Sequence, residues 1–284
     1  MTTVDQLHED QLTYWNGPGG THWVARYEHM DRMLLPVSDV LLARAGIAPG
    51  MTVLDIGCGC GGTVAAIAHL VGPTGKALGL DISRPMLEVA ARRVGEYPHV
   101  TLICDDAAHR SFPPATVDVL VSRFGVMFFG DPEAAFANLR GALKPGARMT
   151  FACWRPINEN PWMKLPLDAV AAHVAPGPRP DPDAPGPFAF SDRERVRRIL
   201  TNAGFINVRI TPRDLVLDLA AGLDLSEAVH QSIEMGPIRR ALEGQPETTQ
   251  RVAREAVARA LQPYVTPTGV LLTAGIWVVE ASTP

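Results

Sequence analysis

The chain has 284 residues, of which 46% are hydrophobic and 20% charged, and its formal net charge is −4 at pH 7. These proportions are typical of a globular protein with an ample core, either one large α/β domain or a domain with a cap. The slightly negative charge argues against nucleic acid as the main partner, because phosphate binding requires clustered lysine and arginine.

The N-terminal stretch and the apolar runs predict a cytoplasmic protein that does not enter a membrane. MTTVDQLHEDQL is polar and acidic, unlike a signal or transit peptide. No apolar run approaches the roughly 18 residues of a membrane span, and the longest candidate, VLLTAGIWVV, suits a buried strand. The four cysteines (58, 60, 104 and 153) lie in or beside predicted core strands, so we interpret them as reduced thiols. Cys58-x-Cys60 has no second pair or histidine cluster to complete a metal site, and we expect none.

The first part of the chain predicts a helical leader followed by a parallel sheet. From residue 51, short apolar runs alternate with helical patterns, as in a sheet with helices on both faces. Strands are predicted at 51–56, 77–82, 99–104, 117–122 and 148–154, and helices at 63–72, 85–94 and 132–143. Lys144, Pro145 and Gly146 are expected to stop the last of these helices. We therefore assign 1–36 to the helical leader and 37–154 to the core.

After residue 154 the alternation breaks, and we predict a Pro-rich insertion over 155–190. Residues 173–190 hold six prolines and are expected to form a loop. Ser191 is the predicted cap of a helix that ends at Gly204, and a strand at 205–219 returns the chain to the core. Residues 220–266 are predicted as a helical cap, with a helix starting at Pro246, and 267–284 as the final core strand. No crossover helix fits between the last two strands, which predicts a hairpin-like end to the sheet.

VLDIGCGCGG (53–62) places a glycine-rich loop directly behind the first strand. Gly57, Gly59 and Gly62 match G-x-G-x-x-G, in which glycines permit a sharp turn and a close approach of ligand to backbone. Alone, this pattern is weak evidence, because it suits a dinucleotide pyrophosphate or another adenosine-bearing cofactor.

Three carboxylates follow successive strands, at the edge where open α/β sheets bind ligands. Asp55 would repel a pyrophosphate but suits a cofactor with ammonium and sulfonium groups. Asp81 is placed to accept ribose hydroxyls, and Asp106 to accept from an adenine amine. Each acid alone could be a solvated loop residue; together they favour a positively charged adenosine cofactor.

Several of these segments resemble the ordered motifs of class I S-adenosylmethionine-dependent methyltransferases: VLDIGCGCGG, LGLDIS, CDDAA, VDVLVSRFGVMFF and LKPGARMTFACW. The most similar branch is methyltransferase type 11, which includes the ubiquinone/menaquinone-biosynthesis type, and the resemblance spans about residues 37–154. It implies an α/β, Rossmann-like, doubly wound fold. The sheet would be seven-stranded and mostly parallel with an antiparallel last strand, and helical lid and cap insertions would cover the site.

The resemblance also implies S-adenosyl-L-methionine as cofactor and S-adenosyl-L-homocysteine as product. Gly57 and Gly59 would pack against the methionyl part, Asp81 would hold the ribose, and the backbone of Arg123 would meet the amino group. The family often has a small or hydroxylated residue where Cys60 stands. The whole implied cofactor set is Asp55, Gly57, Cys58, Gly59, Asp81, Ile82 against the adenine, Asp106 and Ala107 at the adenine edge, and Arg123.

Two other classes compete with this interpretation. An NAD(P)-dependent oxidoreductase would fit the glycine loop and Asp81, but it predicts an apolar residue at Asp55. It also often carries a Tyr-x-x-x-Lys pair, which is absent from this sequence. A binding-only protein with a degenerate site is disfavoured, because every expected cofactor position is filled.

The acceptor side is less sharply predicted. The segment YWNGPGGTHW (14–23) is interpreted as a mobile lid whose aromatics, separated by flexible glycines, close over the reacting groups; the alternative is a helix-capping turn that fills a groove. In-line methyl transfer needs mainly positioning, although a hydroxyl acceptor would need a base. Among the histidines at 22, 29, 109 and 230, His22 is the chosen catalytic candidate. The candidate substrate residues from the segment 14–23 are Tyr14, Trp15 and Trp23. The others, which could equally be plain core, are Met127, Phe128, Trp154 and Trp162.

We expect the acceptor to be a small, partly apolar metabolite, with methylation at O, N or C left open. A metal-assisted mechanism has no clustered ligands to support it. The oligomeric state is also left open, with a homodimer among the options.

Overall fold

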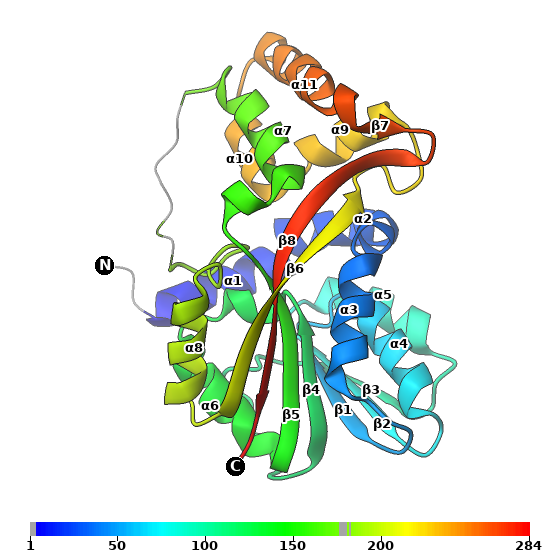
Figure 1. Cartoon of the computed structure of the whole chain (residues 1–284), viewed down its shortest axis with the longest axis vertical. Helices are drawn as coiled ribbons and strands as arrows, with labels where there is room; N and C mark the ends of the chain where they lie inside the picture. Colours follow the sequence, from blue (N-terminus) through cyan, green and yellow to red (C-terminus); the bar gives the residue numbers. More distant parts are fainter. Residues whose placement is uncertain (1–3, 176–180, 182) are drawn as a thin grey trace.

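The computed structural model describes residues 4–175, 181 and 183–284. A sheet runs along the lower part of the molecule, and a group of helices forms a cap above one end of it (Figure 1). The strands are β1 (Thr52–Ile56), β2 (Lys76–Asp81), β3 (Val100–Cys104), β4 (Val117–Arg123), β5 (Leu143–Trp154), β6 (Ile206–Asp218), β7 (Val265–Thr266) and β8 (Gly269–Ser282).

The strand order is β3-β2-β1-β4-β5-β8-β6, with the two-residue β7 paired to β8 alone. Neighbouring strands from β3 to β5 are parallel, and β8 runs antiparallel to both β5 and β6. The predicted sheet, with seven main strands and an antiparallel last strand, is therefore confirmed. Strands β6 and β8 rise together beyond the other strands to carry the cap (Figure 1).

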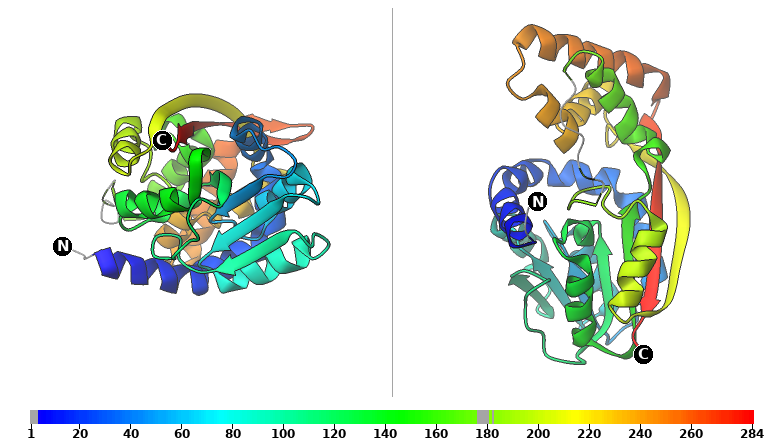
Figure 2. Two further views of the ribbon diagram at one scale, coloured as in Figure 1. Left: turned by 90° about the horizontal axis from the view of Figure 1, so that it is seen from below. Right: turned by 90° about the vertical axis from the view of Figure 1, so that its left-hand side faces the viewer.

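Helices cover both faces of the sheet (Figures 1 and 2). One face carries α3 (Leu35–Ala45), α4 (Gly62–Val71) and α5 (Arg84–Val94), and the other carries α6 (Pro132–Ala142) and α8 (Arg193–Asn202). The predicted cap of α8 was wrong by one residue. Asp192 is the N-cap, and its carboxylate accepts from Glu194 N at 2.9 Å, whereas the Ser191 backbone completes the preceding turn.

The largest core cluster surrounds β4, β5 and β8, and its bulky members include Phe136, Phe151 and Phe190. Three cysteines are buried, but Cys104 is exposed because β3 is the edge strand of the sheet. All four cysteines lie in or beside core elements, as predicted, and all four are free thiols. Helix α6 ends at Ala142, next to the predicted stop at 144–146, and β5 begins at Leu143 rather than at the predicted residue 148.

The cap consists of α7 (Pro161–Ala171), α9 (Leu225–Ile233), α10 (Gly236–Leu242) and α11 (Glu247–Leu261). Helix α7 packs against α10 and α11, although the sequence predicted no helix within 155–190. Pro161 occupies the first turn of α7, where no amide donor is needed. Of the predicted loop 173–190, residues 176–180 and 182 lie outside the described residues. No helix in the described part of the chain is long and apolar enough to cross a membrane.

The leader contributes α1 (Val4–Asn16) and α2 (Pro18–Met33) before α3 begins. Both helices lie between the cap and the upper end of the sheet in the two perpendicular views (Figures 1 and 2). Short 3-10 turns, η1 (Gly125–Phe128), η2 (Ile157–Glu159) and η3 (Gln262–Tyr264), complete the chain.

Candidate cofactor and acceptor site

The loop after β1 approaches the loop after β4 closely. Gly57 has φ +68°, and a Cβ there would lie 2.6 Å from Gly125 Cα, so both the conformation and the space require glycine. The amides of Gly57 and Cys58 donate to Leu80 O at 2.8 and 3.1 Å, which fixes the loop against the end of β2. The sequence therefore builds a rigid backbone cradle at the carboxyl ends of the strands.

Asp81 holds this cradle together. Its Oδ2 accepts from Gly59 N and its Oδ1 from Ser83 N, both at 2.8 Å, and the residue is 6% exposed. Burial raises the pKa of Asp81 to about 6, although its backbone hydrogen bonds act in the opposite direction. Each carboxylate oxygen can accept a further hydrogen bond, so the group is positioned for ligand hydroxyls.

Asp55 is buried with one oxygen unpaired. Thr63 Oγ1 donates to Oδ2, whereas Oδ1 finds no partner among the described residues, and the residue is only 1% exposed. Burial raises the pKa of Asp55 to about 7, against the lowering effects of Thr63 and Arg123. An unsatisfied buried carboxylate oxygen is costly, so the site favours a ligand that brings a cation or a donor.

Asp106 lies after β3, as predicted, but it already has imidazole partners. Its Oδ1 accepts from Ala108 N at 3.0 Å, while Oδ2 contacts His109 Nδ1 and lies 3.5 Å from His8 Nδ1. The expectation that the chain has no clustered metal ligands was therefore wrong. The sequence could not show this cluster, because α1 brings His8 to the loop only in the folded chain.

Arg123 ends β4, where it was expected, and its side chain binds residues of α2 and α3. It donates to Asp31 Oδ1 at 3.0 Å and to Ser38 Oγ at 2.9 Å, and Asp31 also pairs with Arg93. The carboxylate of Asp31 would touch a Cβ at Gly62 (2.8 Å), so it lies directly against the glycine-rich loop. Sequence reasoning missed Asp31 and Arg93, since no local pattern marks residues that meet only in three dimensions.

The leader is attached to the turn after β2. Asn16 Nδ2 donates to Ile82 O at 2.9 Å, its Oδ1 accepts from Arg84 N at 3.0 Å, and Ser83 Oγ donates to Trp15 O at 2.7 Å. These bonds place the end of α1 against the residue expected to contact the adenine.

The glycines of YWNGPGGTHW are packing positions inside or beside α2. A Cβ at Gly19 would lie 2.3 Å from the Tyr14 ring, and one at Gly20 would lie 2.0 Å from Trp15 O. The argument that flexible glycines separate the aromatics was therefore wrong, because both glycines are buried and helical. The proposal of a lid has to rest on where α1 and α2 lie.

The predicted substrate residues form two separate groups. Trp15 meets Tyr14, Trp23 and Phe128 edge-on, with ring centroids 5.2, 6.4 and 5.1 Å apart. Trp154 packs on Trp162 at 4.8 Å and stacks on Phe124 at 4.1 Å. Met127 is buried in the main core with Trp154 and Trp162. The first group therefore lies at the leader, and the second lies where the core meets the cap helix α7.

Comparisons with known proteins identify the family. A family model described as a methyltransferase domain matches residues 53–146. The nocamycin O-methyltransferase of Saccharothrix syringae is 31% identical over 193 residues, which cover 64% of this chain and 69% of that protein. The chain belongs to the class I S-adenosylmethionine-dependent methyltransferases.

Other relatives cover less of their own length. The ubiquinone/menaquinone biosynthesis C-methyltransferase of Burkholderia vietnamiensis is 36% identical over 124 residues, 42% of this chain and 51% of that protein. The chain thus spans about half the length of such curated relatives. The Haemonchus contortus phosphoethanolamine N-methyltransferase 2, a solved structure, has TM-score 0.57 and 18% identity and covers 100% of this chain and 61% of that one, which shows the fold alone.

His22, the candidate base of this methyltransferase-family chain, lies between leader and cap. It makes a 2.8 Å hydrogen bond to Glu234 O and a 2.9 Å contact with Arg26, and burial lowers its pKa. Arg26 also donates to Gln231, and burial lowers its pKa to about 10. Nothing in these contacts directs His22 toward the cofactor loop.

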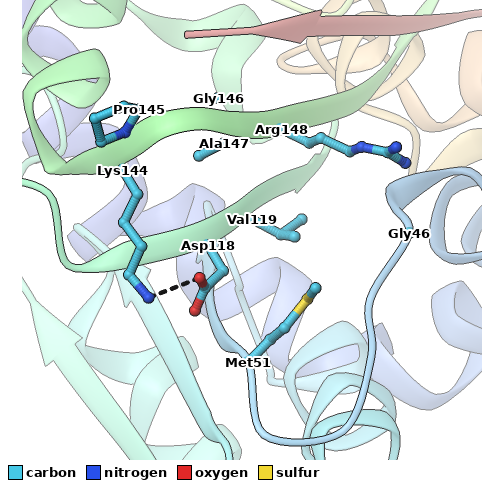
Figure 3. A pocket seen from close by; sticks show the side chains of 9 residues that line it. All are labelled: Gly46, Met51, Asp118, Val119, Lys144, Pro145, Gly146, Ala147 and Arg148. Atoms are coloured by element: carbon cyan, nitrogen blue, oxygen red, sulfur yellow. Dashed lines mark hydrogen bonds and ion pairs between the residues drawn. The ribbon is translucent and has the colours of Figure 1, made fainter.

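The cavity of Figure 3, about 340 Å³ in volume, lies at the opposite edge of the methyltransferase sheet. It is bounded by the amino-terminal parts of β4 and β5, where Lys144 Nζ and Asp118 Oδ1 form a 2.7 Å ion pair. Asp118 Oδ2 also accepts from Thr52 N at 2.9 Å, so its carboxylate is fully engaged in fastening the strands. Ligands of open α/β sheets bind at the carboxyl ends, and we do not assign this cavity to the active site.

Proposed function

We propose that this protein transfers the methyl group of S-adenosyl-L-methionine to a small, partly apolar acceptor and releases S-adenosyl-L-homocysteine. The observation that carries the proposal is the buried, unpaired Oδ1 of Asp55 beside the positive-φ Gly57. A cofactor with an ammonium and a sulfonium would satisfy this carboxylate, whereas a pyrophosphate would be repelled by it.

The residues around the loop fit such a cofactor. Asp81 would hold the ribose hydroxyls, Ile82 would pack on the adenine, and Asp106 with Ala107 would bind the adenine edge. Gly57, Cys58 and Gly59 would line the methionyl part, with the backbone of Arg123 at its amino group. When bound, the cofactor supplies an electrophilic methyl group; the chain orients it, excludes water and neutralises its charge.

We further propose that the leader (1–36) is a lid and that the helices of 220–266, together with α7, enclose the acceptor. Tyr14, Trp15, Trp23 and Phe128 would present an aromatic wall from the leader side, and Met127, Trp154 and Trp162 would shape the core side. Relatives named as C- and O-methyltransferases support the reaction class without selecting the acceptor atom. For a hydroxyl acceptor, His22 is the proposed base, and its lowered pKa keeps the imidazole neutral. We place the reaction in the cytoplasm.

Calorimetric titration tests the proposed cofactor. Purified protein is titrated with S-adenosylhomocysteine and separately with NADH, as wild type, Asp81→Asn and Asp118→Asn. Asp118 is the matched control, because its carboxylate also accepts a strand amide but lies at the opposite edge of the sheet. We expect micromolar binding of S-adenosylhomocysteine, lost only in Asp81→Asn, and no heat from NADH. Binding of NADH alone would overturn the proposal in favour of an oxidoreductase.

A further inference from the structure

A histidine from the leader and a histidine and an aspartate from the core converge at the loop after β3. His8 lies on α1, while Asp106 and His109 lie in the loop after β3. One ligand atom of each residue lies within 4.8 Å of the other two, and the two imidazole rings pack edge to face with centroids 4.7 Å apart.

The donor set matches a borderline divalent transition metal. Imidazole nitrogen and carboxylate oxygen bind zinc at about 2.0–2.2 Å, which places neighbouring ligand atoms of a tetrahedral site about 3.3 Å apart. His8 Nδ1 and Asp106 Oδ2 are already 3.5 Å apart, and His109 Nδ1 contacts the same oxygen. We propose that His8, Asp106 and His109 form a binding site for such an ion, with Zn²⁺ as its probe.

The surroundings of these side chains suit reversible binding. The His109 side chain is 63% exposed and that of His8 28%, so an ion reaches the site from solvent and keeps water in its open coordination position. Asp106 is 15% exposed, and its other oxygen, Oδ1, is held by Ala108 N. That bond fixes the carboxylate with Oδ2 facing the two imidazoles, as an orienting partner of a ligand does.

An ion at this site would affect both the leader and the proposed cofactor site. It would join α1, part of the proposed lid, to the loop after β3. It would also occupy Oδ2 of the carboxylate that is proposed to bind the adenine amine; this second consequence rests on the proposed function. Metal and cofactor should therefore weaken each other's binding by the same factor.

The first experiment measures metal binding without cofactor. The full chain, freed of metal with a chelator, is titrated with Zn²⁺ by calorimetry and with Co²⁺ by its visible absorption. The variants are His8→Gln, His109→Gln and the control His69→Gln, an exposed histidine of α4 outside the cluster. We expect one micromolar site, weakened at least tenfold in each cluster variant and unchanged in the control. Equal affinities in all four proteins, or no binding in the wild type, would overturn the site.

The second experiment measures coupling. Wild type and His109→Gln are titrated with S-adenosylhomocysteine in the presence of a chelator and then at saturating Zn²⁺. We expect Zn²⁺ to weaken binding severalfold in the wild type only. Binding that is indifferent to Zn²⁺ would refute the coupling while leaving the metal site. Failure of S-adenosylhomocysteine to bind under either condition would refute the proposed cofactor and would not bear on the metal titration. Thermal unfolding of each variant shows whether the fold is retained.

Discussion

Cofactor binding should depend on pH through Asp55. With the pKa of this carboxyl raised to about 7 by burial, a large part of the cofactor-free protein carries a protonated, neutral Asp55 near neutrality. S-adenosylhomocysteine lacks the sulfonium but keeps the ammonium group, which favours the ionised carboxyl, so the apparent dissociation constant scales with one plus the ratio of protonated to ionised carboxyl. Lowering the pH from 8 to 6.5 should therefore weaken S-adenosylhomocysteine binding about fourfold through Asp55 alone. Asp81, whose pKa is about 6, adds to the loss below that range.

Calorimetry in buffers of different ionisation enthalpy measures both the affinity and the protons released. We expect proton release on binding between pH 6.5 and 7.5 in the wild type. Asp55→Asn should bind S-adenosylhomocysteine more weakly at pH 8, and its affinity should hardly change with pH over this range. Asp118→Asn, which alters a carboxyl at the other edge of the sheet, should keep the wild-type slope. A wild-type affinity independent of pH, or a slope that persists in Asp55→Asn, would refute the reasoning.

Three further outcomes follow from the same contacts. The raised pKa of Asp55 stabilises the protonated fold, so the free energy of unfolding without cofactor should fall by a few kcal/mol as pH rises from about 4 to 7; denaturant unfolding checks this, and an unchanged pH dependence in Asp55→Asn would count against it. Gly57→Ala should lower the free energy of unfolding by about 1–3 kcal/mol more than Gly72→Ala does, and it should abolish S-adenosylhomocysteine binding. Both glycines have positive φ, but nothing lies within 4 Å of a Cβ at Gly72, so equal losses would exclude the close approach as the cause. Asp31→Asn should lower the free energy of unfolding, measured in urea, by about 1–3 kcal/mol, because it leaves the Arg123 side chain, 12% exposed, without its carboxylate. The control Glu255→Gln removes an exposed ion pair and should lower it by at most about 1 kcal/mol. Similar values for the two variants would contradict a special role for Asp31.

Sequence periodicity predicted the core because the central parallel strands β1 and β4 are buried on both faces and their apolar runs leave little choice of register. The final core strand was predicted within 267–284, and the structure has β8 at Gly269–Ser282. The carboxylates at 55, 81 and 106 were located for the same reason, since ends of parallel strands meet at one edge. Local sequence patterns were therefore sufficient to predict the residues whose position follows from the strand that carries them.

The features that were not predicted from the sequence depend on contacts between segments that are distant along the chain. Helix α7 contains Pro166 and forms because its buried face packs in the cap, which outweighs the low helix propensity of proline. Gly19 and Gly20 looked like hinges, but they are small because Tyr14 and Trp15 press against them. Their tertiary role cannot be distinguished from flexibility by composition.

Helix α2 shows how such contacts determine the site. Three of its residues on one face, His22, Arg26 and His29, meet the cap helix α9 and the turn after it through Glu234, Gln231 and Glu227. The opposite face, about half a turn away, carries Val24, Tyr27 and Asp31 against the glycine-rich loop and α5. The remaining sides are divided between the exposed Thr21, Glu28 and Arg32 and the half-buried Trp23 and Met30.

Two opposite faces of α2 are therefore held at once, one by the cap and the other by the glycine-rich loop and α5. Moving α2 off the cofactor loop breaks the pairs of Asp31 with Arg93 and Arg123, and it also disturbs the hydrogen bonds of Arg26 to the cap. Arg26 is a partly buried cation, and losing its acceptors without gaining water would be costly. Opening on the cofactor side is thus coupled energetically to the cap, and in the proposed reaction one helix would enclose both the methyl donor and its acceptor.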